Sequence, residues 1–476
     1  AAGNSAESVL AFAIDRDPTL DCSNTGATPW FVVALALLGL RRRRIGLAVI
    51  LFATSPAHAI TTGGAFAGPT QGSGSSVYWN AAALAADSRG TRFHLEGGGS
   101  LVDISYTRAD AGANGSPFDT VNFQRLSPTL SFSFVAPTRE DYLFLVAGGF
   151  SPSTSGAGWP GDGPQRFFGT DQTQVTYAIP VGVIWAPSPA VAVSVMAGPS
   201  WGSIDTASAF DYGAFANGLL PPSADPFPTE SDLLEGQTLL RASGFGYSGT
   251  AGIWFSPTRD LQFGFGAVYN SHIQMSGDVE LVLPDSIEES TGIALEPDGD
   301  LDVELRLPWA VNSEVQYRIR SHQLAVTFDY QRRSRQDVFP ADVSQGSPSF
   351  INGPRLSVKG SVDDWTLGVR DLWTLNESFE LAARVDFDPR AIPDEALSPV
   401  NLDFTSLELA LGVPHQVSES VALAMTYAYR HLRSVNVTNS LYNPRLPGDS
   451  GLNLPSANGL YAPAPVHRLV LGVDWL

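Results

Sequence analysis

The sequence is poor in three things: cysteine, basic residues and long apolar runs. Its only cysteine is Cys22, which excludes a disulfide framework or a zinc–thiolate site from everything that follows it. Acidic residues outnumber basic ones by 48 to 28, and this argues against nucleic-acid binding, which needs a basic face. The two apolar runs, 30–40 and 45–53, are shorter than the roughly 18 residues of a membrane-spanning helix. A helical membrane protein is therefore disfavoured.

Residues 41–59, RRRRIGLAVILFATSPAHA, have the three parts of a secretory signal peptide. Arg41–Arg44 form a charged n-region, Ile45–Ala53 an apolar h-region, and Ala57–Ala59 an A-x-A cleavage box. We therefore predict cleavage after Ala59. The exported chain then begins ITTGGAFAG and lacks cysteine, which suits an oxidising compartment.

Residues 1–40 precede this signal and have a pattern of their own. The stretch CSNTGATPWFVVALALLGLRRRR combines a cysteine, a polar spacer, a thin apolar segment and an arginine cluster. Over residues 1–44 the chain resembles the C-terminal sorting tail of surface proteins in myxobacteria and their relatives. Such a tail ends a protein, so we expect residues 1–40 to be a fused or mis-assigned upstream segment. The alternative is an unusually long n-region.

After Ile60 the dominant pattern is an alternation of apolar with small or polar residues. Every second side chain of VTYAIPVGVIW, residues 175–185, is apolar, and LQFGFGAVY, FELAARVDF and VALAMTYAY repeat the pattern. Because side chains alternate faces along a strand, each segment presents one apolar face. The pattern predicts fourteen strands, at residues 92–107, 126–136, 141–150, 173–186, 190–202, 243–256, 260–273, 303–320, 322–334, 360–373, 378–388, 403–415, 420–433 and 466–476.

Short and long connections alternate between these strands. The long ones fill about 108–125, 151–172, 203–242, 274–302, 335–359, 389–402 and 434–465. Tight turns at one end and long loops at the other are typical of outer-membrane barrels, and aromatic residues near strand ends are typical of a lipid-facing belt. A soluble all-β protein would bury its bulky side chains in a shared core. We therefore predict an all-β fold, a 14-stranded antiparallel transmembrane β-barrel over residues 91–476.

Residues 60–90 do not alternate and are rich in glycine, serine and alanine. Fourteen strands enclose a lumen wider than wall side chains alone can fill. The small inward residues of the predicted strands leave room for a further segment. We therefore predict that residues 60–90 form an N-terminal plug, or hatch, in the lumen.

At this point the chain resembles the FadL-type outer-membrane transporter family. VYWNAAAL matches the family's hatch, where Asn80 is kept but alanine replaces the proline of the Asn-Pro-Ala motif. Residues 130–149 match the family's second and third strands, and residues 387–413 match a late outside loop and the strand after it. The resemblance implies passive transport of hydrophobic molecules, long-chain fatty acids or hydrocarbons. Outside loops capture the substrate, an apolar pocket in the barrel receives it, and hatch movement with an inward kink of the third strand releases it sideways.

The resemblance also directs attention to the hatch and the third strand. Asn80 is expected to be a gating residue, or else a turn former. Trp79 and Phe66 are expected to line the pocket, or else to pack the plug against the wall. Gly148 and Gly149 permit a kink of the third strand, or simply end it.

Four further residues complete the candidate set. Arg384 and Arg430 belong to a group of lumen-facing charges that bind a substrate carboxylate, or pair across the barrel and pin the plug. Phe167, in the loop sequence GPQRFF, and Phe215, in the 203–242 loop, belong to apolar clusters that bind ligand, or pack loop against loop.

The sequence has no pattern typical of catalysis or metal binding. The six histidines after residue 59 are scattered without metal-ligand spacing, and no Gly-x-Ser-x-Gly elbow is present. We predict a protein that is not an enzyme and has no metal and no cofactor. The expected partners are hydrophobic small molecules and the lipid and lipopolysaccharide of a Gram-negative outer membrane, with no nucleic acid and a monomeric chain. The alternative is a non-transporting barrel with an adhesive or structural role, and a polar-solute porin is a weaker third reading.

Overall fold

The computed structural model describes residues 63–86, 90–109, 118–140, 142–152, 154–213, 228, 230–282, 298–336, 338–344, 353–358, 360–376, 379–440 and 457–475. The expected signal peptide 41–59, the segment 1–40 and the candidate Phe215 lie outside these residues. Within the described part, no helix is both long and apolar enough to cross a membrane.

The wall of the barrel consists of fourteen staves, each built from one or two strands. The single-strand staves are β1 (Arg92–Arg108), β2 (Val121–Pro137), β7 (Val191–Asp211), β8 (Glu235–Phe255), β17 (Phe379–Asp388) and β18 (Ser406–Ser418). The two-strand staves are β3 (Leu143–Gly149) with β4 (Thr154–Gly158), β5 (Asp171–Ala178) with β6 (Val181–Ser188), β9 (Leu261–Asn270) with β10 (His272–Val282), β11 (Asp298–Arg306) with β12 (Ala310–Ile319), β13 (His322–Gln331) with β14 (Val338–Ser344), β15 (Gly353–Val358) with β16 (Asp364–Asn376), β19 (Val421–Leu432) with β20 (Val435–Val437), and β21 (Gly459–Pro463) with β22 (Val466–Trp475).

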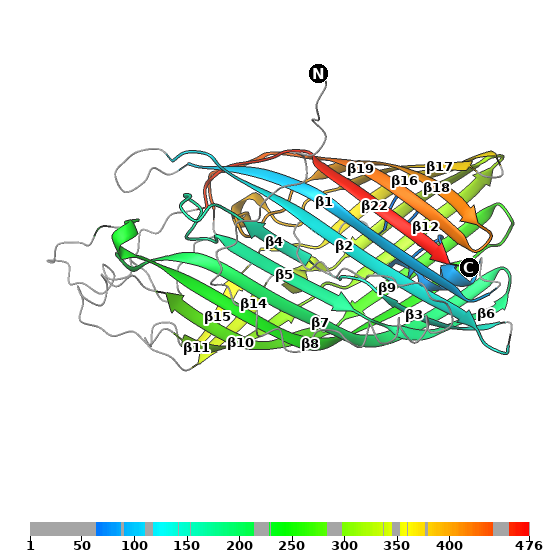
Figure 1. The fold of residues 1–476 in the computed structure, drawn as a ribbon, viewed down its shortest axis with the longest axis horizontal. Coiled ribbons are helices and arrows are strands. Elements are labelled where there is room, and N and C mark those ends of the chain that lie inside the picture. Colours follow the sequence, from blue (N-terminus) through cyan, green and yellow to red (C-terminus); the bar gives the residue numbers. More distant parts are fainter. Residues whose placement is uncertain are drawn as a thin grey trace, which may run out of the picture. The chain divides into compact units, whose positions relative to one another are not determined.

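Each stave is antiparallel to the next along the chain, and the last stave returns to the first. β1 pairs with β2 on one side and with β22 on the other, from Phe93↔Trp475 to Leu101↔His467. Figure 1 shows this closure, with the red β22 beside the blue β1. A closed barrel satisfies backbone hydrogen bonds without leaving a free sheet edge. The predicted 14-stranded antiparallel barrel is confirmed.

The predicted apolar face of each strand points away from the lumen. Outward side chains in the middle of the wall, such as Val195, Leu411 and Leu471, are more than half exposed. The outward aromatic side chains include Trp185, Tyr269, Trp365 and Trp373. This outer surface is apolar, as it is in barrels that face lipid.

The predicted long connections are partly wrong, because strands continue into them. β7 and β8 are 21 residues long each and extend into the expected 203–242 loop, and β10 and β11 take up both ends of the expected 274–302 loop. The alternation itself continues there: Met275 and Val279 on β10 and Val303 on β11 point inward and are buried in one apolar cluster. The predicted strand 173–186 is in turn divided at Ile179–Pro180, because proline lacks the N–H that a ladder requires.

The described helices are all short. Two belong to the segment before the wall, α2 (Ser76–Trp79) and the 3₁₀ turn η1 (Ala81–Ala85). Three further 3₁₀ turns lie in connections: η2 (Asp232–Leu234), η3 (Arg333–Gln336) and η4 (Asp394–Ala396).

Candidate functional site

Residues 63–86, here called the plug, lie inside the barrel. Ser133 on β2 donates its hydroxyl to the carbonyl oxygen of Ser73 at 3.3 Å. Across the lumen, the backbone N–H of Ala65 donates to the hydroxyl oxygen of Thr426 on β19 at 3.0 Å. Contacts with β8, β9, β12, β16 and β17 are described below, so the plug touches the wall on all sides.

Glycines of the wall make room for the plug. A Cβ atom on Gly266 of β9 would collide with the carbonyl oxygen of Trp79, and one on Gly252 of β8 would collide with Oδ1 of Asn80. The small inward residues that the alternation predicts are therefore the positions where the plug backbone approaches the wall most closely.

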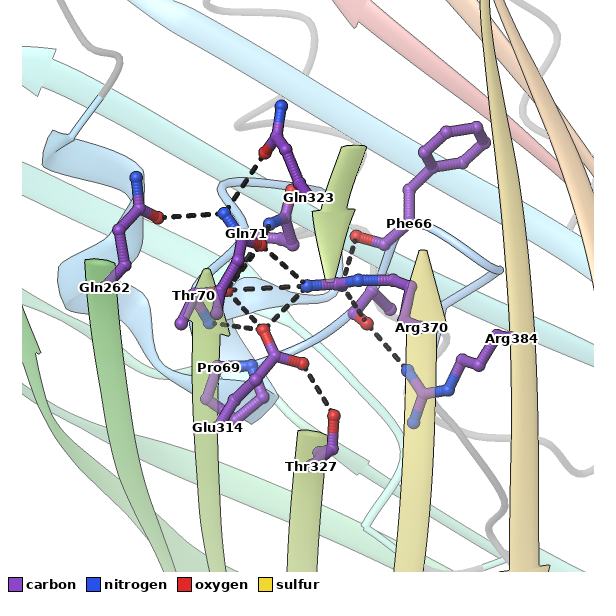
Figure 2. Close-up of polar contacts among 12 residues, drawn as sticks. Phe66, Pro69, Thr70, Gln71, Gln262, Glu314, Gln323, Thr327, Arg370 and Arg384 are labelled. Carbon is purple, nitrogen blue, oxygen red and sulfur yellow. Dashed lines mark hydrogen bonds and ion pairs between the residues drawn. The ribbon is translucent and has the colours of Figure 1, made fainter. Parts of the chain in front are cut away.

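A buried ion pair holds the first half of the plug (Figure 2). Arg370 on β16 lies 2.7 Å from Glu314 on β12, and both side chains are fully buried. Arg370 also donates to the carbonyl oxygen of Ala67 at 2.8 Å. Glu314 accepts the backbone N–H of Thr70 at 3.2 Å, the hydroxyl of Thr70, and the hydroxyl of Thr327 at 2.6 Å. One carboxylate and one guanidinium thus join the plug to three strands.

The candidate Arg384 on β17 is a second anchor of the plug. Its Nε lies 2.7 and 2.9 Å from the two carboxylate oxygens of Asp386, and its Nη1 donates to the carbonyl oxygen of Ala67 at 2.7 Å. The guanidinium carbon lies 5.7 Å from the ring centroid of Trp79, a cation–π distance. The side chain is placed as the plug-pinning alternative expects, and a role in substrate binding stays a prediction.

The second half of the plug, α2 and η1, packs through apolar side chains. Val77, Trp79 and Leu84 are buried against inward residues of the wall, which are Val135, Phe144, Val146, Phe150, Ile184, Met196 and Trp254. The Tyr78 ring meets the Phe150 ring edge-on at a centroid distance of 5.4 Å. Burial, with a smaller contribution from Asp329, raises the pKa of Tyr78 above its ordinary value, so this hydroxyl stays protonated.

Asn80 joins the two helical turns of the plug to each other and to the wall. Its Oδ1 accepts the backbone N–H of Ala82 at 3.1 Å and caps η1. Its Nδ2 donates to the carbonyl oxygen of Pro69 at 2.8 Å and to that of Ile253 on β8 at 3.0 Å. The turn-forming role is present in this geometry, while gating stays a prediction. Phe66 is half-buried, and a Cβ atom on Gly412 of β18 would touch its ring.

The third stave leaves its neighbour at Gly149. β2 and β3 pair from Pro137↔Phe144 to Phe132↔Gly149, and β4 then pairs with β5. Among the described residues no ladder joins β4 to β2. The part of β2 from Val121 to Ser131 therefore has no backbone partner on this side. Gly148 lies at this departure point against Val77 of the plug.

Side chains cross the resulting gap. Tyr177 on β5 donates to the carbonyl oxygen of Leu130 at 3.2 Å, and Arg125 on β2 donates to the hydroxyl of Thr173 at 2.7 Å and to the carbonyl oxygen of Gln172 at 3.3 Å. At this place the wall is held by side chains instead of a backbone ladder.

The lumen contains a small polar pocket on one side of the plug, with a cavity volume of about 20 Å³. Tyr78 and Trp79 are its aromatic residues, and the rest of the lining is Asp329, Gln331, Arg333, Thr366, Asp386, Asp388, Ser406, Glu408 and Arg430. The candidate Arg430 lies here and bonds to Asp388 at 2.5 Å and to Ser406 at 2.7 Å. The resemblance implies an apolar pocket, but the lining of this one is mostly polar and charged.

Glu314, Asp329 and Asp388 are site residues that the sequence pattern does not single out. The alternation contains the relevant information, since Asn312, Glu314 and Gln316 are the inward positions of β12. The alternation predicts which residues point into the lumen. It does not predict which of them come into contact, because that depends on the register of the strands around the barrel.

The candidate Phe167 lies in the connection between β4 and β5 and is buried. The neighbouring Arg166 pairs with Glu235 at 2.7 Å, and its guanidinium lies 4.3 Å from the centre of the Phe167 ring. Trp159 of the same connection donates to the carbonyl oxygen of Pro399 at 2.9 Å. Phe167 is thus placed in loop-on-loop packing, and its role in ligand capture stays a prediction.

A closed fourteen-stave barrel with an internal plug defines the class of fold. No family model and no curated protein matches this sequence. The fold is similar to the crystal structure of a Pseudomonas aeruginosa FadL homologue, with a TM-score of 0.72, 15% identity, and coverage of 87% of this chain and 95% of that one.

Two transporters of known cargo have similar folds. The Pseudomonas putida toluene transporter TodX has a TM-score of 0.59 and 13% identity, and the match covers 84% of this chain and 94% of TodX. The Ralstonia pickettii toluene transporter TbuX has a TM-score of 0.56 and 12% identity, with coverage of 86% and 97%. This chain therefore has the fold of FadL-type outer-membrane barrels.

Proposed function

We propose that this chain is a passive transporter of hydrophobic molecules in the outer membrane of a Gram-negative bacterium. The substrate is captured among the long connections, enters the barrel, and leaves sideways through the wall when the plug shifts. The fold it has in common with a FadL homologue and two toluene transporters supports this proposal.

The observation that carries the proposal is the gap beside the third stave. Opening a paired wall would break several backbone hydrogen bonds at once, and in lipid each broken bond is costly. Where β4 does not pair with β2, side chains such as Arg125 of β2 and Tyr177 of β5 form the connection between β2 and β5, and these side chains can move without breaking a ladder. The apolar half of the plug lies beside this gap, with Val77 against Gly148, so a shift of α2 would connect the lumen with the gap.

Plug movement is testable with a disulfide, because the exported part of the chain has no cysteine of its own. A Cβ atom on Gly64 would lie 2.9 Å from the Cβ of Thr426, about 1 Å closer than the roughly 3.8 Å of a disulfide, so the plug backbone has to move away slightly for the bridge to form. The double variant Gly64→Cys/Thr426→Cys would therefore tie the plug to β19. The measurement is uptake of radiolabelled dodecane, dodecylamine and dodecanoate by cells of a Gram-negative host that lacks its own transporter of this class.

Gating by movement of the whole plug predicts uptake by the wild-type chain, loss of uptake in the oxidised double variant and recovery after reduction. The reduced double variant is the matched control, because it carries the same two cysteines without the bridge. Full uptake with residue 64 tied to β19 would reject movement of the whole plug, while leaving transport and a shift of the apolar half with α2 intact. No uptake by the wild-type chain would instead favour the alternative, a non-transporting barrel with an adhesive or structural role.

A further inference from the structure

The polar pocket beside Tyr78 and Trp79 has an uneven charge balance. Among the residues that the structure describes, the charged groups that line it and their ion-pair partners are six carboxylates (Asp329, Asp364, Asp386, Asp388, Asp403 and Glu408) and four guanidiniums (Arg333, Arg384, Arg430 and Arg468). Arginines form ion pairs with most of these carboxylates, but the net charge of the set is negative. This net charge would repel an anionic head group at short range.

One carboxylate of the pocket has no partner. Asp329 on β13 lines the pocket, is 6% exposed, and forms no ion pair with any described basic residue. Its Oδ1 atom is buried and accepts no hydrogen bond. A buried carboxylate that accepts no hydrogen bond is energetically costly. A bound molecule with a hydrogen-bond donor would therefore gain stability by donating to Asp329. Nη2 of Arg384 also lacks a partner, but this arginine is covered by Trp79 and does not line the pocket.

Apolar side chains follow directly on the loop side of the pocket. Arg430 lines the pocket from β19, and the next inward residue of that strand is Leu432. Leu432 belongs to a buried apolar cluster with Phe404 and Val435. The lumen therefore presents a polar end and an apolar end next to each other, which is the complement of an amphiphile.

We propose that the pocket binds amphiphiles whose head group donates hydrogen bonds and carries no negative charge, with an alkyl amine fitting best. The inference rests on the proposed function, because it names the cargo of the same lumen. The ammonium group donates to Asp329, neutralises part of the excess negative charge, and lies beside the aromatic rings of Tyr78 and Trp79. The alkyl tail extends toward Leu432. A fatty acid, whose carboxylate cannot donate, is disfavoured at this site.

The test compares three probes of one chain length: dodecylamine, dodecanol and dodecanoate. Binding of each radiolabelled probe is measured with the full chain in nanodiscs of zwitterionic phospholipid, and partition into empty nanodiscs is subtracted. Dodecylamine should bind most tightly and dodecanoate most weakly. This order is read from the wild-type protein, so it decides the question even where a variant does not fold.

Asp329→Asn removes the charge and keeps the shape of the side chain. It should weaken dodecylamine binding roughly tenfold or more, the usual effect of losing a hydrogen bond to a charged group, and leave dodecanoate binding unchanged or stronger. The matched control is Asp278→Asn on β10, an exposed carboxylate remote from the pocket, which should change nothing.

The contrary results are distinct. Dodecanoate binding as tightly as dodecylamine, or an Asp329→Asn variant that binds dodecylamine like wild type, would overturn the inference. Uptake of dodecane and dodecanoate without preference for the amine would do the same while leaving the proposed function in place. Absence of both binding and uptake for every probe would remove the proposed function and the inference together.

Discussion

The two halves of the plug are held in the lumen by different forces. Residues 63–71 are fixed to β12, β16 and β17 by hydrogen bonds and by the buried pair of Arg370 and Glu314. Residues 76–85 pack through apolar side chains against β2, β3, β6, β7 and β8. Hydrogen bonds and ion pairs require definite geometry, whereas apolar contacts are non-directional. The polar half therefore anchors the plug, and the apolar half can shift without leaving a buried charge unpaired.

The largest expected effect comes from breaking the polar anchor. Glu314→Gln leaves the fully buried guanidinium of Arg370 without its counter-charge, and we expect a loss of about 3–5 kcal/mol in the free energy of unfolding. The measurement is urea unfolding of the protein in lipid vesicles. The control is the double variant Glu314→Gln/Arg370→Met, which removes both charges and should recover much of the loss. Equal stability of the single variant and wild type would show that the anchor is not what holds this half.

The next effect comes from the apolar half. Leu84 is almost fully buried in η1, and Leu84→Ala should cost about 3 kcal/mol through lost contacts and the cavity left behind. Hydrogen exchange provides the sharper reading: the amides of residues 76–86 should exchange faster, while those of residues 63–71 stay protected. Faster exchange of both segments together would mean that the plug moves as one body and that its two halves are not held independently.

Asn80 links the halves and should have an intermediate effect. Asn80→Ala removes the cap of η1 and the two donations to the carbonyl oxygens of Pro69 and Ile253, at an expected cost of about 2 kcal/mol. Asn80→Ser keeps a capping oxygen and loses the amide donors without burying a charge, so it separates the two contributions. Unfolding midpoints of the two variants give the measurement, and a result for Ser equal to that for Ala would assign the whole effect to the donors.

The smallest effect is expected at the gap beside the third stave. Tyr177→Phe removes the hydrogen bond to the carbonyl oxygen of Leu130 and should cost about 1 kcal/mol in stability while raising the rate of dodecane uptake. Tyr427→Phe is a matched control, since the Tyr427 hydroxyl bonds to His467 on the outer face, 2.7 Å away. The same uptake for both variants would exclude a gating role for Tyr177.

The barrel could be predicted from sequence because its evidence is local. Alternation along a single strand shows which side chains face lipid, and Met425 or Leu471 needs no knowledge of other strands to be placed outward. The site could not be predicted in the same way. Glu314 and Arg370 lie on β12 and β16, with β13 between them, and their meeting depends on the register of the strands and on the position of the plug backbone. The polarity of the pocket is likewise a property of several staves together.

The long loops were mispredicted for a related reason. The spacing of strongly apolar segments overestimates loop length here, because β10 and β11 carry charged residues on their outer face beyond the apolar belt, such as Asp278 and Asp300. Their inward face remains apolar, with Met275 and Val303 buried. Where a strand extends beyond the membrane, its apolar side chains face the lumen instead of the lipid. A prediction that follows only the outward apolar face therefore ends the strand too early.

The seam between β1 and β22 has a consequence for the order of assembly. It joins the first strand of the wall to the last, so the wall stays an open sheet until the whole chain has been delivered. The plug precedes β1 directly. Glu96 of β1 lies against Gly74 of the plug, where an added Cβ would lie 3.0 Å from its Cγ, and Ser133 of β2 donates a hydrogen bond to the carbonyl oxygen of Ser73. The plug can therefore settle on the first hairpin while the sheet is open, and closure of the seam then encloses it. A plug that is enclosed as the wall closes never needs to pass through either end of the finished barrel.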